Sequence, residues 1–163
     1  MSTTPHFSKP ALGGFLAASF AAAAIGSYAT FENVRTWFPQ LNKPAWNPPD
    51  SVFGPVWTVL YILMAVAAWR AWSVARSTNP GAARGLVMGY GLQLVANALW
   101  SVLFFGLKKP EWALVDIAVL WGLLVWMQVR LSRVDRLAAG LWLPYLLWVS
   151  FASALNFAIV RMN

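Results

Sequence analysis

The sequence predicts an all-α membrane protein: a bundle of five transmembrane helices with a long folded loop between the first and second helices. Three observations support this fold class. Of the 163 residues, 60% are hydrophobic, only 10% are charged, and the apolar residues gather in long runs. A soluble domain is about half apolar and about a quarter charged, so this chain lacks the polar residues for a surface that faces water.

Five apolar runs are long enough to cross a bilayer, whose hydrocarbon core of about 30 Å requires about 20 residues of helix. The runs are residues 11–30, 52–75, 85–105, 113–131 and 137–160. Residues 1–10 form an N-terminal tail and residues 161–163 the C-terminal end, which leaves residues 11–160 as one transmembrane domain without an internal repeat.

The first run also has features of a cleaved signal peptide, because Lys9 precedes it and Ala22-Ala23-Ala24 resembles a cleavage site. The run stays apolar through Ala29, which is longer than the usual apolar region of a signal peptide and favours a retained span. Within the later spans, Pro55 is predicted in the first turn of the second, and Pro144 is expected to kink the fifth.

Twelve basic residues against five acidic ones give a net charge of +7. They lie in short gaps between apolar runs and not in one patch, so they indicate the flanks of membrane spans and not a nucleic-acid surface. On the N-terminal side of the bundle we expect seven: Lys9, Arg70, Arg76, Arg84, Arg130, Arg133 and Arg136. On the other side we expect five: Arg35, Lys43, Lys108, Lys109 and Arg161. This small excess favours a cytoplasmic N-terminus.

Residues 31–51 form the one long connection and contain four prolines and several aromatic residues. A loop of this length in a compact protein is usually functional or disordered, and the aromatic content argues against disorder. We therefore expect a lid that folds over one end of the bundle, with Asn47-Pro48-Pro49 fixing how it enters the second span. The alternative is an interfacial segment in which Trp37 belongs to the aromatic belt of the membrane surface.

Polar side chains inside the spans indicate which helix faces point inward. Amides are costly in hydrocarbon unless they find a partner, so Gln93, Asn97 and Asn156 should face the bundle interior. Three spans carry aromatic or amide residues along one helical stripe: Trp57, Tyr61, Met64 and Ala68; Tyr90, Gln93, Asn97, Trp100 and Phe104; and Pro144, Trp148, Ala152 and Leu155. Such stripes are often plain core packing, but the mixture of amides, indoles and small residues favours a concave pocket.

The tryptophans, Asp116 and the small residues in the spans can each be interpreted as structural or as functional. Eleven tryptophans exceed the needs of two interfacial belts, which suggests stacking on a flat aromatic ligand. Asp116 is the single carboxylate within a span, and it is either a functional group or a side chain that reaches the interface or a neighbouring helix. Gly85 and Gly89 allow close approach of a second helix and are candidate dimer contacts, whereas Ala18, Ala22 and Gly26 predict packing inside the bundle.

Several classes of chemistry lack the residues they need. The chain has no cysteine, and its single histidine, His6, lies in the N-terminal tail, so no metal site and no tightly bound cofactor are expected. Paired carboxylates, a Ser/His/Asp set and a glycine-rich phosphate loop are also absent, which excludes hydrolysis and phosphoryl transfer. An ion channel or proton carrier would show more buried ionisable groups.

Several ordered motifs carry a family resemblance: Lys43-Pro44-Ala45-Trp46-Asn47-Pro48-Pro49, Gly54-Pro55-Val56-Trp57, Asn97-Ala98-Leu99-Trp100, Trp112-Ala113-Leu114-Val115-Asp116 and Pro144-Tyr145-Leu146-Leu147-Trp148. Together they resemble the TspO/MBR family, the tryptophan-rich sensory protein, translocator protein or peripheral-type benzodiazepine receptor. The resemblance runs from about residue 9 to the C-terminus and suggests a bacterial member in the cell envelope.

The resemblance implies a homodimer of five-helix bundles whose pocket, under the long loop, binds protoporphyrin IX, haem, sterol-like lipids or benzodiazepine-type drugs. Carried over to this chain, the pocket would consist of Trp46, Trp57, Tyr61, Asn97, Trp100, Phe104, Trp148, Ala152 and Leu155. In bacterial members, light-dependent oxidative breakdown of protoporphyrin IX is attributed to pocket tryptophans, which match Trp57 and Trp148 here.

One departure concerns sterols, because the family's sterol-associated pattern has a tyrosine where this chain has Phe157. A looser pattern, Arg84…Tyr90…Leu92, is present, but such motifs are weak.

For haem, Tyr61 and Met64 are the remaining candidate iron ligands. We therefore expect binding mainly by stacking, with the propionates near Lys43 or Arg35. The leading hypothesis is a membrane protein that senses, transports or photodegrades porphyrin. The alternatives are a passive transporter or receptor for sterol-like or other small amphipathic molecules, and an enzyme with defined turnover.

Overall fold

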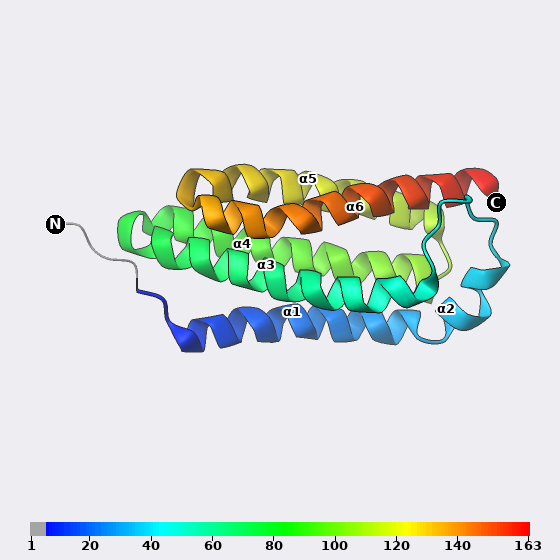
Figure 1. Cartoon of the computed structure of the whole chain (residues 1–163), viewed down its shortest axis with the longest axis horizontal. Coiled ribbons are helices and arrows are strands. Elements are labelled where there is room, and N and C mark those ends of the chain that lie inside the picture. Colours follow the sequence, from blue (N-terminus) through cyan, green and yellow to red (C-terminus); the bar gives the residue numbers. More distant parts are fainter. Residues whose placement is uncertain (1–5) are drawn as a thin grey trace.

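The computed structural model describes residues 6–163, and every regular element in that range is helical. Five long helices form the bundle shown in Figure 1: α1 Lys9–Thr30, α3 Asp50–Thr78, α4 Pro80–Ser101, α5 Pro110–Val134 and α6 Arg136–Met162. Each is long and apolar enough to cross a membrane, α4 being counted with the turn that follows it to Gly106. The predicted fold class, five spans with a folded loop after the first, is confirmed.

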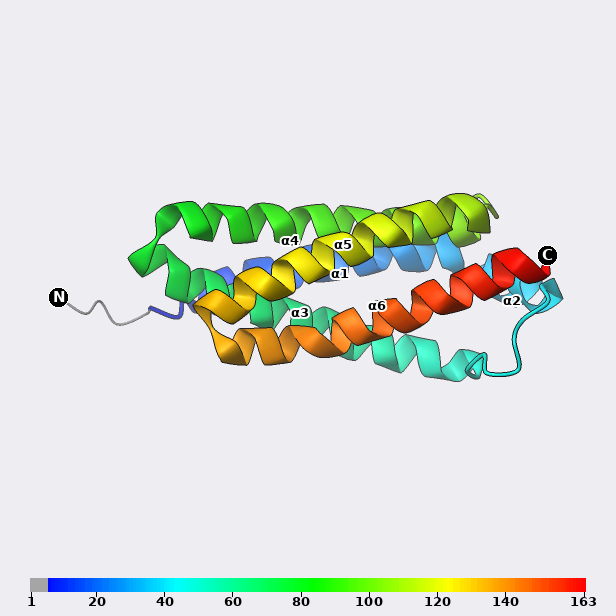
Figure 2. The same ribbon diagram turned by 90° about the horizontal axis from the view of Figure 1, so that it is seen from above.

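The helices form three layers. α5 and α6 pack side by side in the first, α3 and α4 lie in the middle, and α1 covers the opposite face of α3 and α4 (Figures 1 and 2). α3 also contacts α6, and α4 also contacts α5, so the middle pair joins the two outer layers. This arrangement gives α3 and α4 the fewest faces toward lipid, in agreement with the many buried residues of both helices.

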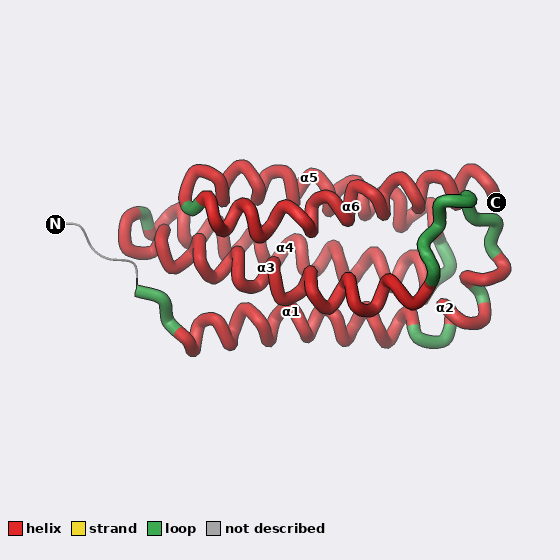
Figure 3. The backbone as a smooth tube through the Cα atoms, viewed as in Figure 1, coloured by secondary structure: helices red, strands yellow, loops and turns green. Residues whose placement is uncertain are grey.

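The connections gather at two ends of the bundle, drawn as green tube in Figure 3. At one end lie the start of α1 and the short α3–α4 and α5–α6 turns, and we call this the basic end because the seven predicted basic residues belong to these segments. At the other lie the long connection from Phe31 to Pro49, the α4–α5 connection and the end of α6, and we call this the lid end.

Short side-chain caps set the helix boundaries at the basic end. The side chain of Asn79 accepts a 3.0 Å hydrogen bond from the amide of Ala82, and Pro80 occupies the first turn of α4. These two residues start α4 at residue 80 and not at the predicted residue 85. Asp135 is the single residue between α5 and α6, and its carboxylate caps α6 by accepting from the amide of Leu137 at 3.0 Å.

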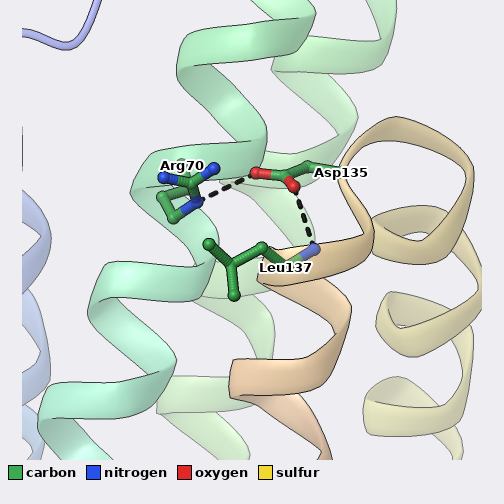
Figure 4. A network of polar contacts seen from close by, with 3 residues as sticks. All are labelled: Arg70, Asp135 and Leu137. Carbon is green, nitrogen blue, oxygen red and sulfur yellow. Dashed lines mark hydrogen bonds and ion pairs between the residues drawn. The ribbon is translucent and has the colours of Figure 1, made fainter.

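The Asp135 carboxylate also holds α3 to this turn. Its Oδ2 atom lies 3.0 Å from Nε of Arg70, while Oδ1 makes the cap on Leu137 (Figure 4). One acid thus ends α5, begins α6 and pairs with α3. In the part of the chain that the structure describes, this is the only ion pair.

Three features of the helices bear on the sequence expectations. Pro55 lies in the second turn of α3, because the helix begins at Asp50 and not at residue 52. Pro144 lies inside α6, which continues through it. After Ser101, α4 widens into a π-helical segment, Val102–Gly106, which the sequence pattern did not indicate. Such wide turns are rare and often occur at functional sites.

An aromatic cavity at the lid end

A cavity of about 560 Å³ opens between α1, α3, α4 and α6 at the lid end. Its volume is in the range of pockets that hold drug-sized molecules. The middle layer supplies most of the aromatic wall, α1 supplies small residues, and the connection after α1 covers one end. The main lining residues are Phe20, Ala23, Ser27, Phe38, Asp50, Phe53, Trp57, Tyr61, Asn97, Trp100, Phe104, Trp148, Ala152, Leu155 and Asn156.

Two tryptophans from different helices meet in the wall. The rings of Trp57 on α3 and Trp148 on α6 lie edge to face, with centroids 6.5 Å apart and planes at 89°. Trp57 also contacts Tyr61 at 5.7 Å, and Phe53 lies edge-on to Trp148 at 5.9 Å. The indole Nε1 atom of Trp148 is buried without a hydrogen-bond partner. This part of the wall therefore offers aromatic surface and one unpaired donor.

The π-helical segment builds the adjoining wall. Trp100 is stacked on Phe104, with ring centroids 5.1 Å apart and an interplanar angle of 25°. The indole Nε1 of Trp100 donates to Oδ1 of Asn156 at 3.0 Å, and the Asn156 amide donates to the carbonyl of Pro110 at 2.9 Å. This chain of contacts fixes the tryptophan plane by linking α4, α6 and the start of α5.

A buried polar network lies behind the aromatic wall. Tyr61 donates its hydroxyl hydrogen to Oδ1 of Asn97, and the Asn97 amide donates to the hydroxyl of Tyr145 at 2.9 Å. Tyr145 donates in turn to Oε1 of Gln93 at 2.9 Å, and the Gln93 amide reaches the sulfur of Met64 at 3.6 Å. The prediction that the span amides face inward is confirmed, because Gln93, Asn97 and Asn156 are all buried.

The connection between α1 and α3 is folded, as the sequence predicts. It contains α2 (Asn33–Thr36) and a 3-10 turn, Phe38–Gln40, and Phe38 is buried against the rings of Phe104 and Phe105. Trp37 contacts Phe104 with a centroid distance of 5.8 Å, so its ring packs against a residue of the cavity wall. We call residues 31–49 the lid.

Two sets of polar contacts hold the lid in place. Lys43 donates from Nζ to the carbonyls of Phe38 and Leu41, at 2.7 and 3.1 Å. The backbone amide of Asn42 donates to Oδ1 of Asn163 at 3.0 Å, and Nδ2 of Asn163 donates to the carbonyl of Asn42 at 3.0 Å. The second set ties the lid to the end of α6.

Eight of the nine predicted pocket residues line this cavity: Trp57, Tyr61, Asn97, Trp100, Phe104, Trp148, Ala152 and Leu155. Trp46 does not. It is 50% exposed and its ring lies 5.7 Å from that of Phe151, outside the lining. The residues that sequence reasoning missed include several from α1, such as Ala23 and Ser27, where small residues indicated packing and no aromatic stripe marked a wall.

The structure does not place Lys43 and Arg35 where they were expected to contact the propionates. The Lys43 ammonium is occupied by lid carbonyls, the guanidinium of Arg35 lies over the Phe31 ring at 4.9 Å, and neither residue lines the cavity. Asp50 is the one charged residue in the lining.

The structure also does not favour the candidate iron ligands Tyr61 and Met64. Met64 is fully buried outside the lining, beside the Gln93 amide. Tyr61 lines the cavity, but its hydroxyl hydrogen is directed to Asn97. The Met64 sulfur therefore does not reach the cavity, and Tyr61 would have to lose the hydrogen that it donates to Asn97 to bind iron as tyrosinate.

The structure also shows the surroundings of the small residues on α1 and α4 and of Asp116. A Cβ atom on Gly26 would lie 3.1 Å from Oγ of Ser101, which confirms packing of α1 on α4. Gly89 faces Trp126 and Met127 of α5 in the same chain, so it is used inside the bundle and is not free for a dimer contact, whereas Gly85 has open space around it. Asp116 lies outside the lining and has one buried carboxylate oxygen without a hydrogen-bond partner.

The five apolar helices and the aromatic cavity between them define the class of this molecule: a multi-pass integral membrane protein with an aromatic pocket at one end of its helix bundle. Comparison with known families gives a match to the TspO/MBR family over residues 15–162. The chain belongs to this family.

Individual relatives agree over nearly the whole length. The chain is 41% identical to the tryptophan-rich protein TspO of Chlorobaculum tepidum, over 93% of this chain and 92% of the relative. It is 39% identical to the tryptophan-rich sensory protein of Cereibacter sphaeroides, over 91% and 89%. It is also 36% identical to the human translocator protein, over 94% and 90%.

Proposed function

We propose that this protein binds a tetrapyrrole, with protoporphyrin IX as the first candidate, in the aromatic cavity, and that it acts in porphyrin sensing, transport or light-dependent oxidative degradation within a bacterial envelope. The observation that carries the proposal is the convergence of three tryptophans, Trp57, Trp100 and Trp148, from three helices on one cavity. Flat apolar ligands gain both area burial and ring stacking on such a wall. Membership of the TspO/MBR family supports the same ligand class.

The lining suggests how the ligand is held. No basic side chain lines the cavity, and the single charged group is the Asp50 carboxylate, which repels propionates. We therefore place the propionates at the mouth of the cavity, in contact with water or lipid headgroups, and the ring against the tryptophans. Binding then rests on stacking and apolar burial. Met64 is buried outside the cavity, and Tyr61 keeps its hydroxyl hydrogen in the bond to Asn97, so we expect iron to add little affinity.

The same wall supports a photochemical role. Trp57 and Trp148 have indole rings in mutual edge-to-face contact, and both line the cavity. A porphyrin excited by light in the presence of oxygen produces oxidants, and indole is easily oxidised. We propose these two residues as the first protein groups that react with the photoexcited ligand. A receptor or passive transporter for sterol-like molecules would use the same cavity without that chemistry.

Titration of purified protein in nanodiscs with protoporphyrin IX in the dark tests the binding proposal. Trp57→Phe and Trp148→Phe should each weaken binding by about three- to tenfold, because an aromatic contact contributes about 0.5–1.5 kcal/mol. Trp112→Phe is the matched control, since Trp112 is 64% exposed and lies outside the cavity. Equal effects of all three substitutions would contradict binding in this cavity.

Product analysis under light and in the dark separates the roles. Oxidised porphyrin products that require light and disappear in Trp57→Phe/Trp148→Phe would support degradation. If the porphyrin binds tightly but stays unchanged in both conditions, degradation is excluded, and sensing or transport remains the proposed role. Haem should bind within about tenfold of the metal-free porphyrin, and a hundredfold preference for haem would show an iron ligand that the geometry does not offer.

A further inference from the structure

A second hollow lies at the basic end, on the outer surface of the α3–α4 hairpin. It has a volume of about 420 Å³ and shares no lining residue with the aromatic cavity. Its walls combine two arginines with one indole and aliphatic side chains: Trp72, Arg76, Pro80, Ala83, Arg84, Val87 and Met88. We call it the hairpin groove.

Both arginines line the groove and lie near the turn that joins α3 to α4. The guanidinium carbon of Arg76 lies 4.7 Å from the ring centroid of Trp72, so the indole face supports the guanidinium. Arg84 follows Pro80 by about one turn of α4, which puts it near the start of that helix. Both arginines are exposed. They lie where a span flank meets the membrane surface.

These charges have no acidic partner. In residues 6–163 the one ion pair joins Arg70 to Asp135, and Asp135 is the only acid at the basic end. Arg76 and Arg84 thus form a pair of positive groups without a carboxylate to neutralise them. A phosphate group accepts bidentate hydrogen bonds from guanidinium groups, and its negative charge would offset part of this positive charge.

The rest of the groove is apolar and points toward the hydrocarbon. Val87 and Met88 follow Arg84 by three and four residues, which places them on the same face of α4 and about one turn deeper in the membrane. They are 44% and 63% exposed. The groove therefore matches a molecule with an anionic head and a hydrocarbon chain.

We propose that the hairpin groove binds an anionic phospholipid, with its phosphate between Arg76 and Arg84 and one acyl chain along Trp72, Val87 and Met88. Basic pockets between membrane helices recognise lipids of this charge. A sterol fits less well. The loose sterol pattern Arg84…Tyr90…Leu92 requires an outward tyrosine, whereas Tyr90 is buried and donates its hydroxyl hydrogen to the Phe15 carbonyl at 2.7 Å.

Native mass spectrometry of the purified chain, with equal amounts of phosphatidylglycerol and phosphatidylcholine of the same acyl chains, tests the proposal. The unmodified protein should retain phosphatidylglycerol preferentially. Each arginine is expected to contribute about fivefold, from about 1 kcal/mol per basic residue near a membrane surface. Arg76→Gln/Arg84→Gln should therefore lose most of the preference.

Arg130→Gln/Arg133→Gln is the matched control. It removes the same charge at the same end, and Arg130 also lies over a tryptophan, Trp126, at 4.8 Å, but outside the groove. This variant should keep the preference. Equal loss in both double variants would mean a diffuse field of positive charge and would overturn the site.

A competition experiment distinguishes a bound lipid from a bound soluble anion. Inorganic phosphate and glycerol 3-phosphate carry the head chemistry without an acyl chain, so at millimolar concentration they should not displace phosphatidylglycerol. Displacement by either would overturn the lipid as occupant. Met88→Ser leaves the arginines in place and should lower retention of phosphatidylglycerol, and unchanged retention would overturn the placement of the acyl chain.

Discussion

The side-chain amide of Asn97 on α4 donates to the hydroxyl of Tyr145 on α6 at 2.9 Å, while its carbonyl oxygen accepts from Tyr61 on α3. One amide thus joins three helices directly behind the cavity wall. Hydrogen bonds between membrane helices contribute about 0.6 kcal/mol on average and up to about 1.7 kcal/mol. These two hydrogen bonds give Asn97 a structural role in addition to its position in the cavity lining.

Asn97→Leu should lower the free energy of unfolding by about 1–2 kcal/mol, because it leaves the Tyr61 hydroxyl without an acceptor and removes the amide donor to Tyr145, whose bond to Gln93 remains. Reversible unfolding in mixed micelles measures the change. Ser132→Ala serves as control, since that exposed hydroxyl bonds only to the Val129 carbonyl of its own helix, and it should shift stability by less than about 0.5 kcal/mol. An Asn97→Leu protein as stable as the control would refute the role of the network.

Substitutions at Asp135 separate its two contacts. Asp135→Asn keeps an amide oxygen that caps α6 but loses the charge opposite Arg70, and we expect a loss of at most about 1 kcal/mol that shrinks as salt is added. Asp135→Ala loses cap and ion pair and should cost about 1 kcal/mol more. Thermal unfolding at low and high salt checks both. Identical stability of the two variants would show that the cap contributes nothing.

Two glycines of α4 should respond in opposite ways to alanine. In Gly89→Ala the new methyl group would overlap the Trp126 ring and lie 2.7 Å from the sulfur of Met127, so α4 and α5 must separate and stability should fall by about 1–3 kcal/mol. Gly85→Ala meets open space and should leave stability unchanged or raise it by up to about 1 kcal/mol, since alanine favours the helix.

Gly85 also remains the predicted contact of a homodimer. If a second chain packs on it, Gly85→Leu should reduce crosslinked dimer in membranes while the monomer stays folded. Gly91→Leu is a suitable control, since that glycine of α4 is exposed and, like Gly85, meets open space. Unchanged crosslinking in Gly85→Leu would remove Gly85 from the interface.

The contacts of the lid predict its mobility. Asn42→Ala removes the side-chain bond to the Met162 carbonyl, and Lys43→Met removes the donor to the carbonyls of Phe38 and Leu41. Both should speed amide hydrogen exchange in residues 31–49 several-fold without a change in α5. Lys109→Met, outside the lid, should leave exchange there unaltered. Exchange in the lid at the original rate would mean that Phe38 and Trp37 alone hold it down.

The five spans and their inward faces were predictable because the cost of a polar group in hydrocarbon is local. Each apolar run had to be a helix, and Gln93, Asn97 and Asn156 had to point inward, wherever the helices lie relative to one another. The stripes on α3, α4 and α6 also indicated a shared pocket, and eight of the nine residues that the family resemblance implied for it line the cavity.

Other properties depended on which helices become neighbours, and this only the tertiary structure decided. Gly85 and Gly89 look alike in sequence, but α5 covers only the second. Lys43 seemed free to meet an anionic ligand, yet the folded lid brings three backbone carbonyls within reach of its ammonium group. By itself the sequence determined the helices, their membrane setting and the inward amides, because these follow from the solvation of each residue. The partners of each side chain were left to the packing of distant segments, whose contact energies no single span contains.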